Sequence, residues 1–195
     1  MALLREGHRC IVGIDEVGRG AWAGPVVAGA VAVPPEIYAN PLVLSDADDS
    51  KRVPARRRQA VADEILSVTS AAIGWVDAWL MDALGATEAT HLAMRTAVTA
   101  LASRTRDGAI DGPGWHARRA SGVARSAEIL LIDGYPIGNP PAPQRAIVRG
   151  DRECLAIACA SLVAKVARDT FMTALAHPFP DYGFDRNVGY GTRDH

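Results

Sequence analysis

The order of its apolar segments is the feature that most constrains the fold of this chain. Residues 10–15 and 25–33 are short apolar runs joined by a glycine-rich connection, which predicts the two strands of a hairpin. Further strands are predicted at 71–76, 128–132 and 146–148, with helices between and after them. A hairpin followed by alternating helices and strands implies an α/β fold, in which a mixed central β-sheet is flanked by α-helices.

Capping residues and apolar spacing predict where three helices lie. Pro54 suits the first helical position of one, and Thr87 is a suitable N-cap for a second that runs to about Ser103. A third, longer helix is predicted from Asp151 to about residue 174. Residues 104–125 are rich in Gly, Arg and Ala with little periodicity, which predicts a flexible surface insertion.

Length and composition bound the class of protein. The 195 residues suffice for one well-cored domain, and no apolar run is long enough to span a bilayer. The first residues lack the apolar core of a secretory signal, and the three cysteines are unclustered, so we expect a cytoplasmic protein. A net charge of −1 does not indicate a nucleic-acid binder. Any nucleic-acid partner must therefore meet a local basic surface.

Two adjacent carboxylates, Asp15 and Glu16, end the first apolar run and are followed at once by Gly18, Arg19 and Gly20. Carboxylate oxygens suit Mg²⁺ or Mn²⁺, and glycines let the backbone approach a phosphate or sugar. Taken alone, the segment fits an ordinary strand and turn as well as it fits a metal site, because successive strand side chains point to opposite faces. A strand that ends or bulges at this point allows both carboxylates to converge.

Two more acids occupy positions typical of ligand sites. Asp133 closes the apolar run 129–132, and groups just beyond a strand's carboxyl end often bind ligands in open α/β sheets. Asp151 follows Gly150 at the head of the long predicted helix. An Asp-Gly turn and a helix N-cap are the simpler interpretations of these two acids, and neither interpretation excludes metal binding.

Basic residues are scattered through segments that usually face solvent. Ser50 and Lys51 lie in a polar loop that can hold a phosphate, and the arginines at 56–58 suit either an exposed helix face or a phosphate-binding track. Lys165 and Arg168 share one face of the long helix with Ser161. Such a face is normally solvated, but near an acid cluster Lys165 can contact phosphate.

Together, five motifs resemble bacterial ribonuclease HII in the order of that family and over nearly the whole chain. They are GIDEVGRGAWAGPVVAGAV, DSKR, IDG, GD followed by IACASLVAKVARD, and YGFDRNVGYGT. The resemblance implies a ribonuclease H-like fold and an enzyme that cleaves the RNA strand of RNA–DNA hybrids. It also implies incision at single ribonucleotides embedded in duplex DNA, so both nucleic acids are the expected partners.

The same resemblance assigns roles to particular residues. It implies that four acids bind metal and are catalytic: Asp15, Glu16, Asp133 and Asp151. It implies that seven residues bind substrate: Gly18, Arg19, Gly20, Ser50, Lys51, Lys165 and Tyr190. Gly18, Arg19 and Gly20 match the loop that senses the ribose 2′-hydroxyl, and Tyr190 matches a tyrosine that stacks on the sugar at the RNA–DNA junction. The expected cofactor is a divalent metal, Mn²⁺ or Mg²⁺, acting as a pair of ions.

Departures from the family pattern leave two alternatives open. Arg52 follows Lys51 where a second lysine is more usual, the insertion at 104–125 is longer than is typical, and the family generally continues beyond His195 through a helix and a basic segment. We therefore expect that the family's C-terminal substrate-binding segment is missing and that residues 1–195 fold as one catalytic domain with weak hybrid binding. The alternatives are a structure-selective DNA endonuclease and an inactive hybrid-binding fragment. We expect a monomer with no membrane partner.

Overall fold

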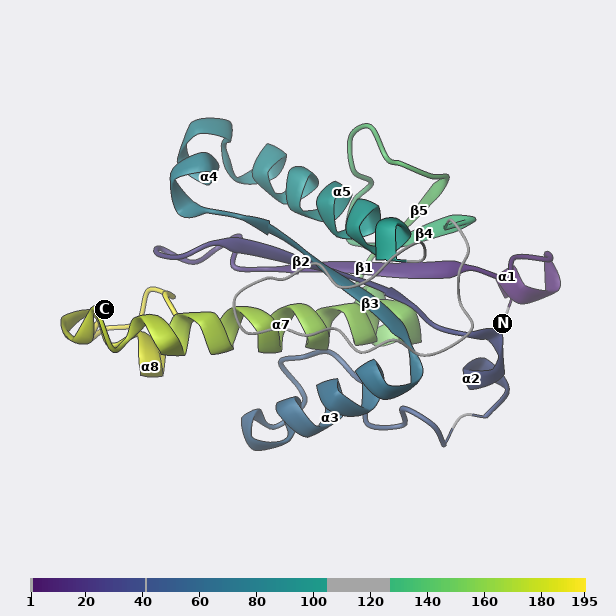
Figure 1. Cartoon of the computed structure of the whole chain (residues 1–195), viewed down its shortest axis with the longest axis horizontal. Coiled ribbons are helices and arrows are strands. Elements are labelled where there is room, and N and C mark those ends of the chain that lie inside the picture. Colours follow the sequence, from purple (N-terminus) through teal and green to yellow (C-terminus); the bar gives the residue numbers. More distant parts are fainter. Residues whose placement is uncertain (1, 41, 105–126) are drawn as a thin grey trace.

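A five-stranded mixed sheet forms the centre of the protein (Figure 1). The computed structural model describes residues 2–40, 42–104 and 127–195. Its strands are β1 Ile11–Val17, β2 Val26–Ala32, β3 Ser70–Val76, β4 Ile129–Asp133 and β5 Gln144–Ile147. They lie in the order β3-β2-β1-β4-β5, with β1, β2 and β3 antiparallel and with β4 and β5 parallel to β1. All five predicted strands and the predicted hairpin are confirmed. Of the insertion predicted at 104–125, all but residue 104 lies outside the described residues.

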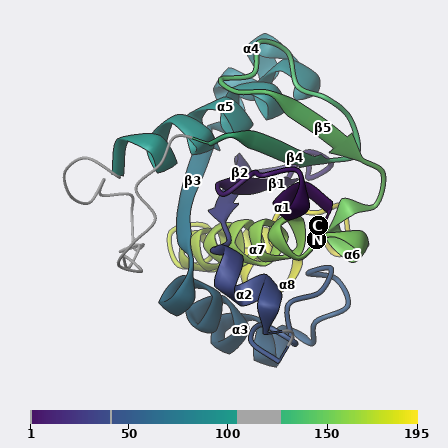
Figure 2. The ribbon, with the colours of Figure 1, turned by 90° about the vertical axis from the view of Figure 1, so that its right-hand side faces the viewer.

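Helices cover both faces of this sheet (Figure 2). On one face lie α4 Ala78–Leu84 and α5 Ala86–Arg104, and on the other lie α7 Leu155–Leu175 and α3 Ala55–Val68. Shorter elements complete the described chain: α1 Ala2–Arg5, α2 Pro35–Ala39, α6 Gly150–Glu153, the 3₁₀ turn Pro180–Tyr182 and α8 Phe184–Asn187. Because both faces are covered, β2 is buried along its whole length and reads as an unbroken apolar run.

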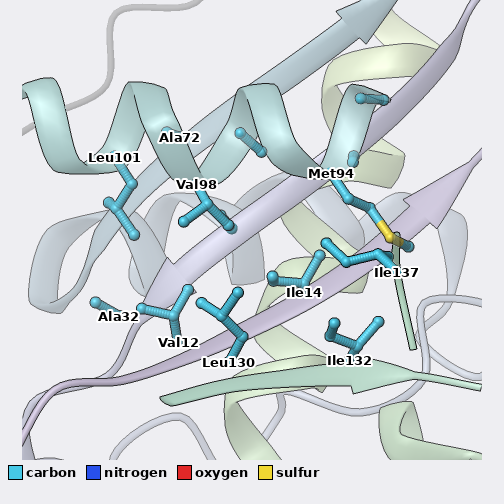
Figure 3. Close-up of a cluster of buried hydrophobic side chains, with 14 of the residues drawn as sticks. Val12, Ile14, Ala32, Ala72, Met94, Val98, Leu101, Leu130, Ile132 and Ile137 are labelled. Carbon is cyan, nitrogen blue, oxygen red and sulfur yellow. The ribbon is translucent and has the colours of Figure 1, made fainter. Parts of the chain in front are cut away.

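The core between α5 and the sheet is aliphatic (Figure 3). Met94, Val98 and Leu101 point from α5 toward the inner strands, and they meet Val12 and Leu130 there. Burying each large aliphatic side chain contributes about 1.5–3 kcal/mol relative to exposure. In the part of the chain that the structure describes, none of the helices combines the length and the apolarity that crossing a membrane requires.

On the opposite face, α7 lies directly on the backbones of β1 and β2. A Cβ atom at Gly13 would collide with the backbone of Ala156, and one at Gly29 would collide with the backbone of Ala160. These two glycines, together with the alanines of α7, allow an approach that larger residues prevent. The helix is therefore held at a fixed distance from the strand that carries Asp15.

The long helix predicted from residue 151 is interrupted. Residues 150–153 form α6, Cys154 is extended with φ −136° and ψ 116°, and α7 begins only at Leu155. Asp151 lies in the first turn of α6, whose N-cap position is taken by Arg149 in the left-handed region at φ 57°. The N-cap interpretation of Asp151 is therefore wrong, and its carboxylate is not used for capping.

Two other predicted helix starts also shift. α5 begins at Ala86, so Thr87 lies inside the helix rather than at its N-cap, and α4 precedes it where no helix was predicted. Gly85, at φ 78°, ends α4 and turns the chain between the two helices. Pro54 occupies the N-cap position of α3, one residue before the predicted place.

Candidate active site

Acids from three elements meet at one end of the sheet. Ile14 pairs with Ile132 on the neighbouring parallel strand, so Asp15 and Asp133 follow side by side at the point where β4 ends. A cleft of about 480 Å³ opens there and contains every residue assigned above to the site. Its lining is Asp15, Glu16, Val17, Gly18, Arg19, Gly20, Ser50, Lys51, Arg58, Asp133, Asp151, Ser161, Lys165 and Tyr190.

Asp15 is the most deeply buried of the four acids, with 6% of its surface exposed. Its side chain accepts a hydrogen bond from the backbone N–H of Glu16 at 2.8 Å and also hydrogen-bonds Ser161 of α7. Burial, followed by the charges of Glu16 and Asp133, raises the pKa of Asp15 well above its usual value. The carboxylate is held in place, but its negative charge is poorly compensated.

Glu16 and Asp151 show the same electrostatic pattern. Burial and the charge of Asp133 raise the pKa of Glu16, although Arg19 opposes the shift. Burial again, with the charges of Asp49 and Asp133, raises the pKa of Asp151. Asp133 Oδ1 accepts hydrogen bonds from the backbone N–H of Gly150 at 2.6 Å and from that of Asp151 at 3.4 Å. Through these bonds, Asp133 fixes α6 against the end of β4 and places Asp151 beside the cleft.

The donor chemistry of these acids fits a divalent cation. Hard carboxylate oxygens are the ligands that Mg²⁺ and Mn²⁺ prefer, and a cation would offset the burial and the mutual repulsion that raise the pKa values of Asp15, Glu16 and Asp151. Over residues 2–40, 42–104 and 127–195, however, no three His, Cys, Asp or Glu side chains already converge as a metal-binding group. The four acids share the cleft and would have to draw together around an ion.

The loop after β1 contains two glycines with different constraints. Gly18 has φ +93°, and a Cβ there would collide with the Arg168 side chain and with the carbonyl oxygen of Pro25. At Gly20 a Cβ would meet nothing within 4 Å. Arg19, between them, donates a hydrogen bond from Nη2 to Thr87 Oγ1 at 3.2 Å. The backbone of Gly20 thus faces the open cleft, while Gly18 is required by the fold.

Asp49 and Ser50 are buried in their turn while Lys51 and Arg52 are exposed, so the prediction of an ordinary solvated loop holds only for its basic end. Asp49 is only 1% exposed and accepts hydrogen bonds from the backbone N–H of Lys51 and, through Oδ2, from Arg152 Nε and Nη2 at 3.2 and 3.0 Å. The Ser161 hydroxyl lies 3.1 Å from that of Ser50. These contacts join the turn to α6 and α7, and Lys51 lies beside the acids in the lining of the cleft.

We expect Arg152→Met to lower the free energy of unfolding by about 1 kcal/mol, because it leaves the buried Asp49 carboxylate without its cationic partner. Loss of a fully buried partner costs more, but the Arg152 side chain is 48% exposed and is partly screened by water. Urea unfolding measures the change. Arg145→Met, at an exposed position on β5, is the matched control. Equal stability of both variants would show that the Asp49–Arg152 pair does not fasten the turn.

The face of α7 that was predicted to be solvated is largely buried. Ser161 and Arg168 have 6% and 0% exposure. Lys165 is partly buried and its Nζ lies 2.8 Å from Asp169 Oδ1. The residues that follow α8 fold back over this face, so that the ring of Tyr190 lies 5.5 Å from Lys165 Nζ and 5.3 Å from the centre of the Arg168 guanidinium. The tyrosine is thereby brought to the cleft from the far end of the sequence.

Three cleft residues were not assigned to the site from the sequence. Val17 continues β1 past the acids, and Ser161 contacts Asp15 as described. Arg58 lies on α3 and reaches the cleft because it precedes the buried Val61 and Ile65 by one and two helical turns. That spacing was a usable signal, since it places Arg58 on the inward face of α3 and not on the exposed one.

Comparison with known proteins gives a consistent family result. The family model of ribonuclease HII matches residues 12–195. A ribonuclease HII from Roseiflexus castenholzii is 41% identical over 195 residues, which are 100% of this chain and 77% of that protein. A ribonuclease HII from Cereibacter sphaeroides is 43% identical over 195 residues, which are 100% of this chain and 79% of that protein.

Solved structures show the same fold at lower identity. The ribonuclease H2 from Pyrococcus horikoshii OT3 has a TM-score of 0.68 and 18% identity, over 94% of this chain and 82% of that chain. The Bst-RNase HIII in complex with Mn²⁺ has a TM-score of 0.67 and 18% identity, over 92% of this chain and 58% of that chain. The predicted ribonuclease H-like α/β fold is therefore confirmed.

Proposed function

Since this chain belongs to the ribonuclease HII family of endoribonucleases, we propose that it hydrolyses the RNA strand of RNA–DNA hybrids and incises duplex DNA at single embedded ribonucleotides. One observation carries the proposal. Acids from β1, β4 and α6 share a cleft with the Gly18–Gly20 loop and with Tyr190, so groups for phosphodiester cleavage lie beside groups suited to a ribose. An RNA-directed endonuclease needs both sets within reach of one nucleotide.

Asp15, Glu16, Asp133 and Asp151 are proposed to hold the divalent metal, Mg²⁺ or Mn²⁺. The oxygen donors of all four acids and the raised pKa values of Asp15, Glu16 and Asp151 support this, as does the Mn²⁺ complex of the Bst-RNase HIII neighbour. Two such ions, when bound, supply an activated water and neutralise the departing 3′-oxygen, which gives 3′-hydroxyl and 5′-phosphate ends. Ser161 and the backbone N–H of Glu16 orient the Asp15 carboxylate for this task.

The remaining cleft residues are proposed to bind and orient the nucleic acid. Arg19, Lys51 and Lys165 place positive charge along the acids and suit backbone phosphates, in a protein whose net charge is −1. The open position beside Gly20 allows the backbone to approach the ribose 2′-hydroxyl. Tyr190 is proposed to stack on the neighbouring deoxyribose, with its ring supported by Lys165 and Arg168.

Single-turnover cleavage of a DNA duplex with one ribonucleotide tests the function. Enzyme is kept in excess, so that the affinity for substrate does not limit the observed rate, and Mg²⁺, Mn²⁺ and EDTA are compared. We expect one incision at the ribonucleotide with either metal, none with EDTA and none in the all-DNA duplex, and mass spectrometry identifies the ends. Equal cutting of the all-DNA duplex would support a structure-selective DNA endonuclease. Binding without cleavage would indicate an inactive hybrid-binding fragment.

Location and assembly are also proposals. Cys10, Cys154 and Cys159 form no disulfide with one another, which supports a reducing compartment such as the cytoplasm. We propose that the protein acts as a monomer, since the four acids, residues 18–20 and Tyr190 all come from one chain. Sedimentation at micromolar concentration checks this.

A further inference from the structure

Arg168 is the largest fully buried side chain of the described residues. Arginine is almost never buried completely unless its donors are satisfied, because the guanidinium stays charged. Here the charge lies between α7, the loop that joins β1 to β2 and the segment that follows α8. None of these contacts belongs to the acids of the cleft, so the residue needs an explanation of its own.

Each of three nitrogens of Arg168 donates to a different carbonyl oxygen. Nε donates to Pro25 at 2.8 Å and Nη2 to Ala23 at 3.0 Å, both in the loop after Gly20. Nη1 donates to Val188 at 2.8 Å, two residues before Tyr190. Within the described part of the chain, no carboxylate lies within 4 Å of the guanidinium, so its hydrogen bonds are used to hold backbone.

The backbone around Arg168 adopts conformations that need such support. Val188 is a β-branched residue in the left-handed region at φ 42°, which such residues rarely adopt. Its neighbour Gly189 has φ +86°, and a Cβ there would collide with the carbonyl oxygen of Ala23. The carbonyl oxygen of Gly189 accepts hydrogen bonds from the N–H groups of Trp22 and Ala23 at 2.8 and 3.1 Å. The two segments are therefore built against each other, with the guanidinium between them.

We propose that Arg168 is a positioning residue, which locks the glycine loop (residues 18–25) and the tail segment (residues 187–190) into one rigid unit beside the acids. This inference rests on the proposed function, in which the glycine loop reads the ribose and Tyr190 stacks on the adjacent sugar. The Arg168 guanidinium also lies over the Tyr190 ring at 5.3 Å, so one side chain sets both the backbone and the ring. Lysine cannot replace it, because a single ammonium cannot reach three separate carbonyls.

Arg168→Lys tests the proposal in the full chain. We expect its single-turnover incision rate at an embedded ribonucleotide to fall on the order of 100-fold, as is usual for a small misplacement of a positioned substrate. Mn²⁺ binding, followed by electron paramagnetic resonance, should stay unchanged because the four acids are untouched. Arg168→Ala should lose activity as well and regain part of it with millimolar ethylguanidinium, which a purely structural loss would not allow.

Two controls separate positioning from general destabilisation. Val98→Ala weakens the core on the α5 side of the sheet, and Arg95→Lys alters an arginine that bonds Gly138 and Glu88 away from the cleft. Both should incise at the wild-type rate while folded. An Arg168→Lys rate equal to that of Val98→Ala at matched stability would overturn the proposal.

Hydrogen exchange makes the proposal testable without activity. Arg168→Lys should speed amide exchange in peptides that cover residues 18–25 and 187–190, but not in those that cover α5, and Arg95→Lys should do neither. Unchanged protection of the two segments would overturn the inference. An inactive wild type with the expected exchange pattern would instead refute the proposed function and leave the locking role of Arg168 standing.

Discussion

Asp15→Asn is expected to lower the incision rate at an embedded ribonucleotide by at least about 1000-fold, equivalent to about 4 kcal/mol of transition-state stabilisation. Asp15 is the most buried acid of the cleft and lies beside both Glu16 and Asp133. An amide oxygen keeps the shape and can still accept the hydrogen bonds from Glu16 and Ser161. It removes the charge on which tight binding of a divalent ion depends.

The same variant should make the metal-free protein more stable at neutral pH. The pKa of Asp15 is raised in the folded protein, so the folded state holds a proton that the unfolded state has lost. Stability in EDTA should therefore fall as the pH rises from the ordinary carboxyl value through the raised one, and Asp15→Asn should remove that fall. Lower activity together with higher stability in Asp15→Asn would indicate that the Asp15 charge destabilises the metal-free fold and is needed for catalysis.

Cleavage assays and urea unfolding at several pH values measure both effects. Asp82→Asn, on the exposed side of α4, is the matched control and should change neither quantity. Turnover of Asp15→Asn close to that of the wild type would remove Asp15 from the proposed metal-binding set. A lower stability in EDTA would contradict the assignment of an uncompensated charge.

Gly20→Ala is expected to reduce incision on the order of 100-fold with little change in the melting temperature. A Cβ at Gly20 meets nothing in the protein, so any loss must come from crowding of the bound sugar. Gly18→Ala provides the contrast, because φ +93° and the collision with Arg168 oppose a side chain at that position. That variant should lose both activity and about 1–3 kcal/mol of stability.

Thermal melting and the single-ribonucleotide assay, run on both variants, distinguish a recognition loop from a simple turn. A Gly20→Ala protein that melts earlier in proportion to its lost activity would indicate only a turn. A Gly20→Ala protein that incises normally would show that the ribose does not approach this backbone.

The strands and the meeting of the acids were predictable because they follow from local pattern and sheet topology. Apolar runs ending in Asp15 and Asp133 place two carboxylates at the same edge once their strands are parallel neighbours. The break at Cys154 was not predictable, because no glycine or proline separates Asp151 from the apolar stripe that begins at Leu155. That break depends on the contact between Asp133 and the start of α6, which joins distant parts of the chain.

The burial of Arg168 was missed for a similar reason. A serine, a lysine and an arginine on one helical face normally indicate contact with water. The turn at Ser50, the loop at residues 23–25 and the returning residues 187–190 cover that face, and no local pattern in α7 indicates which segments will cover it. Helix and strand patterns indicate which apolar residues are buried. They do not indicate a buried arginine, because its carbonyl partners come from segments far away in the sequence.

The position of β1 between β2 and β4 also determines when each edge of β1 can pair during synthesis on the ribosome. One edge of β1 pairs with β2 only a short way along the chain, but the other pairs Ile11 with Ile129. At roughly 5–20 residues per second, the ribosome leaves that second edge open for on the order of ten seconds. During this interval Asp15 and Glu16 exist without Asp133, Asp151 or Tyr190. An emerging chain therefore exposes an unpaired apolar strand edge that can mispair, and its cleft is incomplete until Tyr190 has left the ribosome.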